Sequence, residues 1–197
     1  MLLVDGGEHR FTIPVQHHSR SASYSDIRFS ENLYRDLGRF TRTLMQSTRE
    51  FPCSPAALQL LNDTFPDPTA PDLPFVDAFE RMAESLFSML RGRTELLRSS
   101  AIGPRGQGPA AEYIADLVEA VGGDVYVNPI GGMSLYDDNS FARRGIRLCF
   151  LQSRIAAATF DDPHEACLSV LHHVARYSPT ELNSRLPKFD LLDPTAR

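Results

Sequence analysis

An alternation of strand-like and helix-like segments over residues 95–152 constrains the fold more than any other feature of the chain. The expected strands are Glu95–Ile102, Asp124–Asn128 and Arg147–Gln152, and the expected helices between them are Pro109–Val121 and Ser134–Arg144. Each helix ends near glycine, at Gly122-Gly123 and at Gly145, as left-handed helix termini prefer. This order predicts an α/β fold with a parallel or mixed sheet, right-handed crossovers and flanking helices, Rossmann-like in its C-terminal half.

A run with four prolines over residues 65–74 predicts a stiff connector, because proline fits neither a helix interior nor a central strand. The N-terminal portion, 1–64, is expected to hold a strand pair over Arg10–Val15 and Ser25–Phe29. Its two helices are expected from Asn32 to about Arg49 and from Ser54-Pro55, with serine as the cap.

The portion after the connector, residues 75–197, is expected to begin with a helix. Its apolar side chains recur at helical spacing, which is more typical of a core than of a ligand site: Phe75, Phe79, Met82, Leu86 and Leu90. Two capping boxes predict the closing helices, at Asp162-Pro163-His164-Glu165 and Ser178-Pro179-Thr180-Glu181. We expect residues 1–197 to form a single domain.

The composition is that of a soluble globular protein, with 42% hydrophobic and 23% charged residues in a chain of 197. The net charge of −5 argues against a nucleic-acid partner. No apolar run reaches the length of a membrane span, and the first residues do not resemble a signal peptide. Three widely spaced cysteines suit reduced thiols, so we expect a cytoplasmic protein.

Two glycine-rich loops are candidates for binding an anion. Gly103–Gly108 contains Arg105, and the loop after the next expected strand contains Gly131 and Gly132. Loops at the carboxyl ends of neighbouring parallel strands lie side by side, and each would present a helix N-terminus to a phosphate or carboxylate. Both loops could equally be tight connections with no ligand.

Polar residues flank these loops. Asn128 and Tyr136 could bind a hydroxyl-rich ligand, or could form an Asn-Pro turn and a half-buried core side chain. Ser99, Ser100, and an acid/base pair at Asp137-Asp138 are weaker candidates. The spacing predicts no metal site, since His172 and His173 are helix neighbours that point about 100° apart. No catalytic nucleophile or cofactor motif is identified, so the catalytic residues and cofactors stay unknown.

The segment from Tyr126 to Ile146 resembles the WbqC-like protein family. The matching residues are Tyr126, Asn128, Gly131, Gly132, Leu135, Tyr136, Phe141, Gly145 and Ile146, with weaker agreement at Phe11–Val15 and Leu168–Leu171. The resemblance extends from about His9 to Leu191. It implies a bacterial protein of surface-polysaccharide (O-antigen) biosynthesis, and it raises Tyr126, Asn128, Gly131, Gly132 and Tyr136 above the other candidates.

Two functions stay open. The first is group transfer, by a transferase, on a sugar or nucleotide-linked sugar bound by Arg105, Tyr126, Asn128, Gly131, Gly132 and Tyr136. The second is a non-catalytic accessory or binding protein that keeps the fold. The resemblance implies a further N-terminal segment, which either has been lost or is hidden by a start codon assigned late. If that segment normally contributes a strand, its loss would expose a sheet edge. We therefore expect self-association, as a homo-oligomer.

Overall fold

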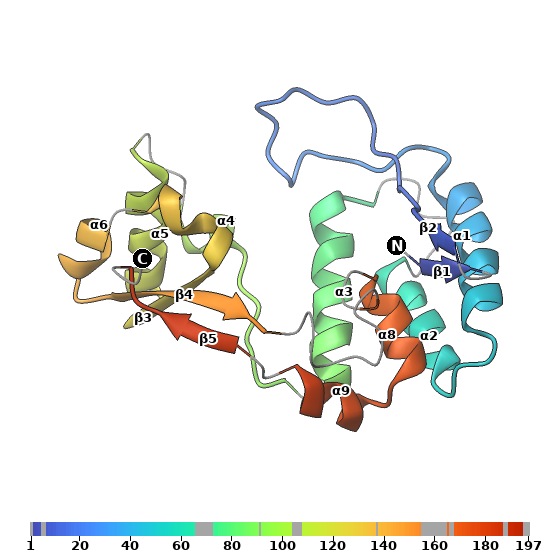
Figure 1. Cartoon of the computed structure of the whole chain (residues 1–197). Helices are drawn as coiled ribbons and strands as arrows, with labels where there is room; N and C mark the ends of the chain where they lie inside the picture. Colours follow the sequence, from blue (N-terminus) through green and yellow to red (C-terminus); the bar gives the residue numbers. More distant parts are fainter. Residues whose placement is uncertain are drawn as a thin grey trace. The chain divides into compact units, whose positions relative to one another are not determined.

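The computed structural model describes residues 2–4, 7–65, 73–90, 92–103, 108–136, 138–154, 165, 168–186 and 189–194, except for the side chains of residues 3, 4 and 138. Its contacts divide the chain into two compact units (Figure 1). Unit 1 comprises Met1–Thr94 and Asp161–Leu186, and unit 2 comprises Glu95–Phe160 and Pro187–Arg197. The expectation of a single domain, divided by a connector at 65–74, stays a prediction.

Unit 1 is mainly helical. Its helices are α1 (Leu33–Thr48), α2 (Ser54–Thr64), α3 (Phe75–Met89), α8 (Val170–Arg176) and α9 (Pro179–Arg185). Helix α2 packs against α3 and α8. A two-stranded antiparallel hairpin of β1 (Leu2–Val4) and β2 (Gly7–His9) contacts the same unit through α1.

Helix α1 confirms the sequence pattern. On α1 the buried Leu33, Leu37, Phe40 and Leu44 follow the spacing of one helix face. The expected cap at the start of α2 is wrong, because Ser54 is already helical and its hydroxyl lies 3.1 Å from that of Thr48. That hydroxyl pair ties the end of α1 to the start of α2.

The expected strand pair over Arg10–Val15 and Ser25–Phe29 is reduced to one antiparallel bridge, Val15 to Phe29. Hydrogen bonds from Gln16 N to Arg28 O (2.8 Å) and from Ser30 N to Pro14 O (3.0 Å) flank it. The two expected segments therefore pair with each other, and the structure shows that they run antiparallel. Pro14 has no amide hydrogen to donate, which limits how far the ladder can extend.

The capping box at Ser178 is confirmed. The Ser178 hydroxyl accepts from the Glu181 amide at 3.3 Å, and the Glu181 carboxylate accepts from the Ser178 amide at 2.8 Å. In the expected box at 162–165 only Glu165 is described, and the other residues lie outside the described part of the chain. Ser169 caps α8 in the same way, by accepting from the Leu171 amide at 3.3 Å.

Unit 2 is a three-stranded mixed sheet with flanking helices. Strand β3 (Val125–Pro129) pairs in parallel with β4 (Arg147–Ser153), which pairs antiparallel with β5 (Phe189–Leu192). The helical segments are α4 (Ser99–Ile102), α5 (Ala110–Ala120), η1 (Ile130–Leu135) and α6 (Asp138–Ala142). The core consists of Ala111, Ala115, Phe141, Ile146, Leu148 and Phe150.

The expected strand over 95–102 is wrong. Residues 92–98 have no regular secondary structure in the described part, and 99–102 form the short helix α4. The segment does not alternate apolar and polar residues, and Leu97 is exposed, so no buried face favours a strand. The α/β class and mixed sheet are confirmed, whereas the Rossmann-like order is not.

Two further boundaries differ from expectation. The single helix predicted over 134–144 is two segments, η1 and α6, and the short strand β5 was not predicted. The glycine helix ends are confirmed, because Gly122 and Gly145 have φ values of 72° and 71°. Among the described residues, no helix combines the length and hydropathy needed to cross a bilayer.

Candidate functional site

Four of the residues predicted to bind substrate come together in unit 2, along β3 and just beyond its carboxyl end. Tyr126 and Asn128 lie on β3, Gly132 on η1, and Tyr136 directly after η1. With Gly131 they form what we call the tyrosine–glycine site. Alternation along β3 turns Tyr126 and Asn128 toward the same face of the sheet, as the half-buried and exposed positions of this strand indicate.

The two tyrosines rest on the buried core of unit 2. The Tyr126 ring stacks on Phe141, with centroids 5.3 Å apart and planes 5° apart. The Tyr136 ring meets Tyr126 and Phe141 edge-on at 5.7 and 6.0 Å. Because Phe141 is fully buried, this aromatic group fixes the orientation of both tyrosines.

The hydroxyls of the two tyrosines lie 3.4 Å apart. Burial raises the pKa of Tyr126 above its ordinary value, and the contact with the Tyr136 hydroxyl raises it further. Tyr126 is therefore a neutral phenol at physiological pH. It can donate or accept a hydrogen bond, but it cannot act as a base.

Gly132 is required by the position of Asn128. A Cβ atom at Gly132 would lie 2.6 Å from Asn128 Nδ2 and 3.5 Å from Tyr136 Cε2, so a larger residue would displace the amide. The structure records no hydrogen bond for the half-buried Asn128 carboxamide within the part of the chain that it describes. This amide is free to bind a polar ligand.

The remaining predicted residues are less informative. Gly131 is exposed with open space around it, and Arg105 lies outside the described residues. Ser99 and Ser100 are exposed at the start of α4. The loop containing Arg105 follows α4 and not a strand, so the argument that two strand ends place both loops side by side does not hold.

An ion-pair network joins α5 and the end of α6, and the sequence analysis missed it. Glu112 accepts from the Ser140 hydroxyl (2.7 Å) and pairs with Arg143 (2.5 Å) and Arg144 (2.8 Å). The Ser140 hydrogen bond and then that of Arg144 hold the pKa of Glu112 below its ordinary value. Arg144 also reaches Asp116 at 2.6 Å, so these charges are engaged with each other. The available signal was the placement of Glu112 and Asp116 four residues apart on one face of α5, where they need basic partners.

A second polar cluster lies in unit 1. The buried Glu165 carboxylate pairs with Arg176 at 2.5 Å and accepts from the Tyr177 hydroxyl at 3.0 Å. Burial, followed by that hydrogen bond, raises the pKa of Tyr177. His172 is 1% exposed, and its ring meets that of Phe51 edge-on at 5.0 Å. These contacts make the cluster part of the packing of α8.

Comparison with known proteins gives one match. Residues 1–184 match the protein family described as the WbqC-like protein family. No curated protein and no solved structure matches the chain.

Proposed function

The chain belongs to the WbqC-like protein family, and from this premise we propose that it acts in bacterial surface-polysaccharide (O-antigen) biosynthesis. Its ligand is a sugar or a nucleotide-linked sugar, and its reaction is group transfer. The tyrosine–glycine site binds that ligand, with Arg105 as a further contact to phosphate or carboxylate.

The single observation that carries this proposal is the open Asn128 carboxamide beside two rigid tyrosines. A carboxamide offers two donors and an acceptor, and each phenol offers one donor and acceptor groups. Aromatic rings supply an apolar surface for the carbon skeleton of a sugar ring. A hydroxyl-rich ligand satisfies both requirements at once.

A second function, that of a non-catalytic accessory protein with the same fold, is favoured by the state of the acidic residues in unit 2. Glu112, Asp116, Asp190 and Asp193 are all held in ion pairs with arginines. For Glu112, the hydrogen bond from Ser140 and the pairing with Arg144 hold the pKa below its ordinary value, so this carboxylate is a poor proton acceptor. This observation argues against a catalytic base among these residues, but not against the binding of a ligand.

Thermal shift of the purified protein against nucleotide-sugars, free nucleotides and simple sugars tests the proposal. A ligand at 100 times its dissociation constant adds about 2.7 kcal/mol of stability. We expect one nucleotide-sugar class to raise the melting temperature. Asn128→Ala and Tyr136→Phe should each reduce the shift, and the exposed Tyr24→Phe in unit 1 should not.

The same screen separates the two functions. Release of free nucleotide from the bound nucleotide-sugar, in the presence of a sugar acceptor, would establish transfer. Binding without turnover would support the accessory protein. If no sugar ligand shifts the melt, or if the shift survives both site substitutions, the tyrosine–glycine site is not the binding site.

A further inference from the structure

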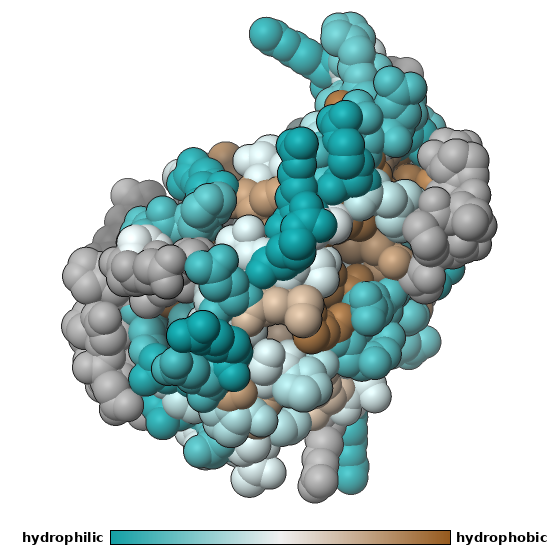
Figure 2. Space-filling view, turned by 90° about the vertical axis from the view of Figure 1, so that its right-hand side faces the viewer, coloured by the Kyte–Doolittle hydropathy of each residue, from teal (hydrophilic) through white to brown (hydrophobic). Residues whose placement is uncertain are grey.

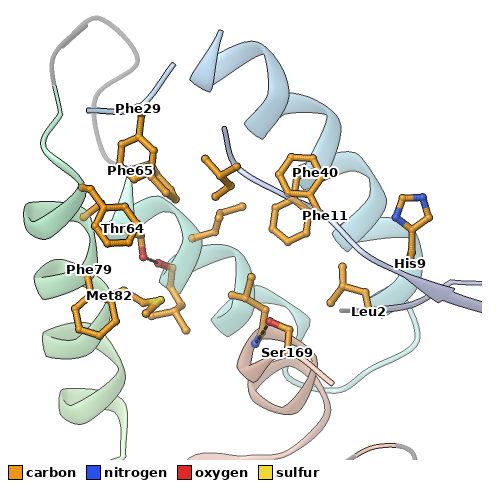
Figure 3. Close-up of a pocket in the computed structure, with 16 residues that line it drawn as sticks. Leu2, His9, Phe11, Phe29, Phe40, Thr64, Phe65, Phe79, Met82 and Ser169 are labelled. Carbon is orange, nitrogen blue, oxygen red and sulfur yellow. Dashed lines mark hydrogen bonds between the residues drawn. The ribbon is translucent and has the colours of Figure 1, made fainter. Parts of the chain in front are cut away.

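Unit 1 contains an apolar cavity of about 290 Å³ (Figure 3). It lies among α1, α2, α3, the first residues of the chain and the start of α8. Six phenylalanines form much of its wall: Phe11, Phe29, Phe40, Phe65, Phe75 and Phe79. Two residues of its wall, Phe79 (57% exposed) and His9, also reach the surface. Three residues of the α3 stripe that was expected as core thus line a hollow: Phe75, Phe79 and Met82.

The phenylalanine rings hold one another in place. Phe11 stacks on Phe40 with centroids 4.5 Å apart, and Phe29 meets Phe65 at 5.5 Å and Phe75 at 5.8 Å. Side chains fixed by such contacts do not collapse readily into a void. The hollow is therefore a preformed feature of unit 1.

Polar groups on the wall are few and unevenly placed. The Thr64 hydroxyl donates to the Leu60 carbonyl of its own helix at 2.8 Å, so its proton is not offered to the cavity. The Ser169 hydroxyl accepts from the Leu171 amide and keeps its own proton to donate. His9 offers a ring nitrogen. Figure 3 shows His9 on the side of the cavity opposite Phe79 and Met82.

The apolar side therefore offers few polar partners to an ordered water. A buried water needs two to four polar partners, whereas dry apolar cavities of about 150 Å³ bind benzene. A hollow of about twice that volume accommodates a longer apolar group. His9 and the Ser169 hydroxyl, which Figure 3 shows away from Phe79, are donors on the wall for a head group that accepts hydrogen bonds.

We propose that the cavity binds one fatty acyl chain as a carboxylate, with the carboxylate near His9 and Ser169 and the chain extending toward Phe79 and Met82. This assignment does not depend on the proposed sugar site, which belongs to unit 2. Apolar side chains also reach the surface on the face shown in Figure 2, but there they lie between hydrophilic ones.

Isothermal titration with straight-chain carboxylates of increasing length, each below its micelle concentration, tests the proposal. Affinity should rise about fourfold for each added methylene, from its burial free energy of about 0.8 kcal/mol, and then level off when the cavity is full. Straight-chain alcohols of equal length should bind more weakly. Affinity that rises without levelling, or binding to phosphatidylcholine vesicles without binding to the free acids, would overturn the proposal.

Two matched pairs of variants locate the head group. Ser169→Ala and Ser178→Ala each remove a helix cap, but only the first removes a hydroxyl from the cavity wall. His9 and His18 are both exposed, but only His9 lies on the cavity wall, so His18→Gln is the control for His9→Gln. Of these four variants, we expect only Ser169→Ala and His9→Gln to bind the carboxylate several-fold more weakly. Equal binding within both pairs would overturn the head-group position.

A cavity-filling variant tests the chain position. Ala78 is buried on the wall, and Ala78→Leu should shorten the chain length at which affinity levels off. An unchanged length limit in a folded variant would contradict the assignment. If this variant does not fold, the chain-length series on the unsubstituted protein decides.

Discussion

At the scale of single residues, backbone conformation and close contact explain several positions that the sequence pattern marked. Gly132 leaves the space in which the Asn128 amide lies, and Gly145 takes a left-handed conformation between α6 and β4. These are different physical requirements, one of space and one of φ, although both residues are glycines. Substitutions can separate them.

Gly145→Ala should destabilise the protein by about 1 kcal/mol, because a Cβ atom is strained at a φ of 71°. No heavy atom lies within 4 Å of the added methyl group, so strain alone carries the effect. Urea denaturation measures it. Gly108→Ala, in the same unit and also in open space, serves as control and should change stability by a few tenths of a kcal/mol at most.

The buried His172 should make the protein less stable at acidic pH. Burial, with smaller contributions from His173 and Arg176, lowers its pKa from 6.5 to about 4. Between these values the unfolded chain binds a proton that the folded protein does not, so the contribution is complete above pH 6.5 and is lost as the pH falls toward 4. The whole contribution of His172 to the free energy of unfolding is about 3 kcal/mol.

Urea denaturation at several pH values tests this expectation. In His172→Leu, the free energy of unfolding should depend less on pH between pH 4 and 6.5, by the uptake of about one proton. The variant His18→Leu, at an exposed loop position, should keep the full dependence. An unchanged slope in His172→Leu would show that other groups cause the acid sensitivity.

At the scale of elements, the described helices depend on their ends and on their partners. Helices α8 and α9 have only seven residues each, too few to be stable alone. Each begins at a serine cap, and α8 packs against α2. The caps define where these helices begin, and packing keeps them formed.

Ser178→Ala should cost about 1 kcal/mol, since it leaves the Glu181 amide without its side-chain acceptor. Thermal denaturation and helix content by circular dichroism check this cost. Thr180→Ala, an exposed change one residue before Glu181, should have little effect. Equal losses for the two variants would mean that the cap contributes nothing measurable.

At the scale of the whole molecule, the chain contributes to the two units in alternation. It builds unit 1, then unit 2, returns to unit 1 for α8 and α9, and ends with β5 in unit 2. Each unit has its own buried core, with Leu44 fully buried in unit 1 and Phe150 fully buried in unit 2. Two cores predict two regions of cooperative stability.

Hydrogen exchange followed by mass spectrometry tests that prediction. Leu44→Ala should cost about 2–5 kcal/mol and lower protection in α1 and α2, while Phe150→Ala should cost about 3–5 kcal/mol and lower protection in β3, β4 and β5. Protection that falls throughout the chain in both variants would instead show one cooperative unit.

The candidate site was predictable only in part. Tyr126, Asn128, Gly132 and Tyr136 are close in sequence, so one strand and one turn suffice to bring them together. The cavity in unit 1 was not predictable, because its wall combines residues as distant as Leu2 and Leu171. The network around Glu112 likewise joins residues about thirty positions apart.

The sequence by itself determined the local features of this protein: the helices with a clear apolar stripe, the capping box at Ser178, the left-handed glycines, and the strands β3 and β4. Each of these depends on residues within a few positions of one another. Only the tertiary structure decided that residues 95–98 form no strand, that Phe189–Leu192 pairs with β4, and that the α3 stripe faces a cavity. A segment with a weak strand pattern becomes a strand only where a hydrogen-bonding partner lies beside it, and an apolar helix face becomes core or cavity according to what packs opposite it, so the tertiary structure decides both.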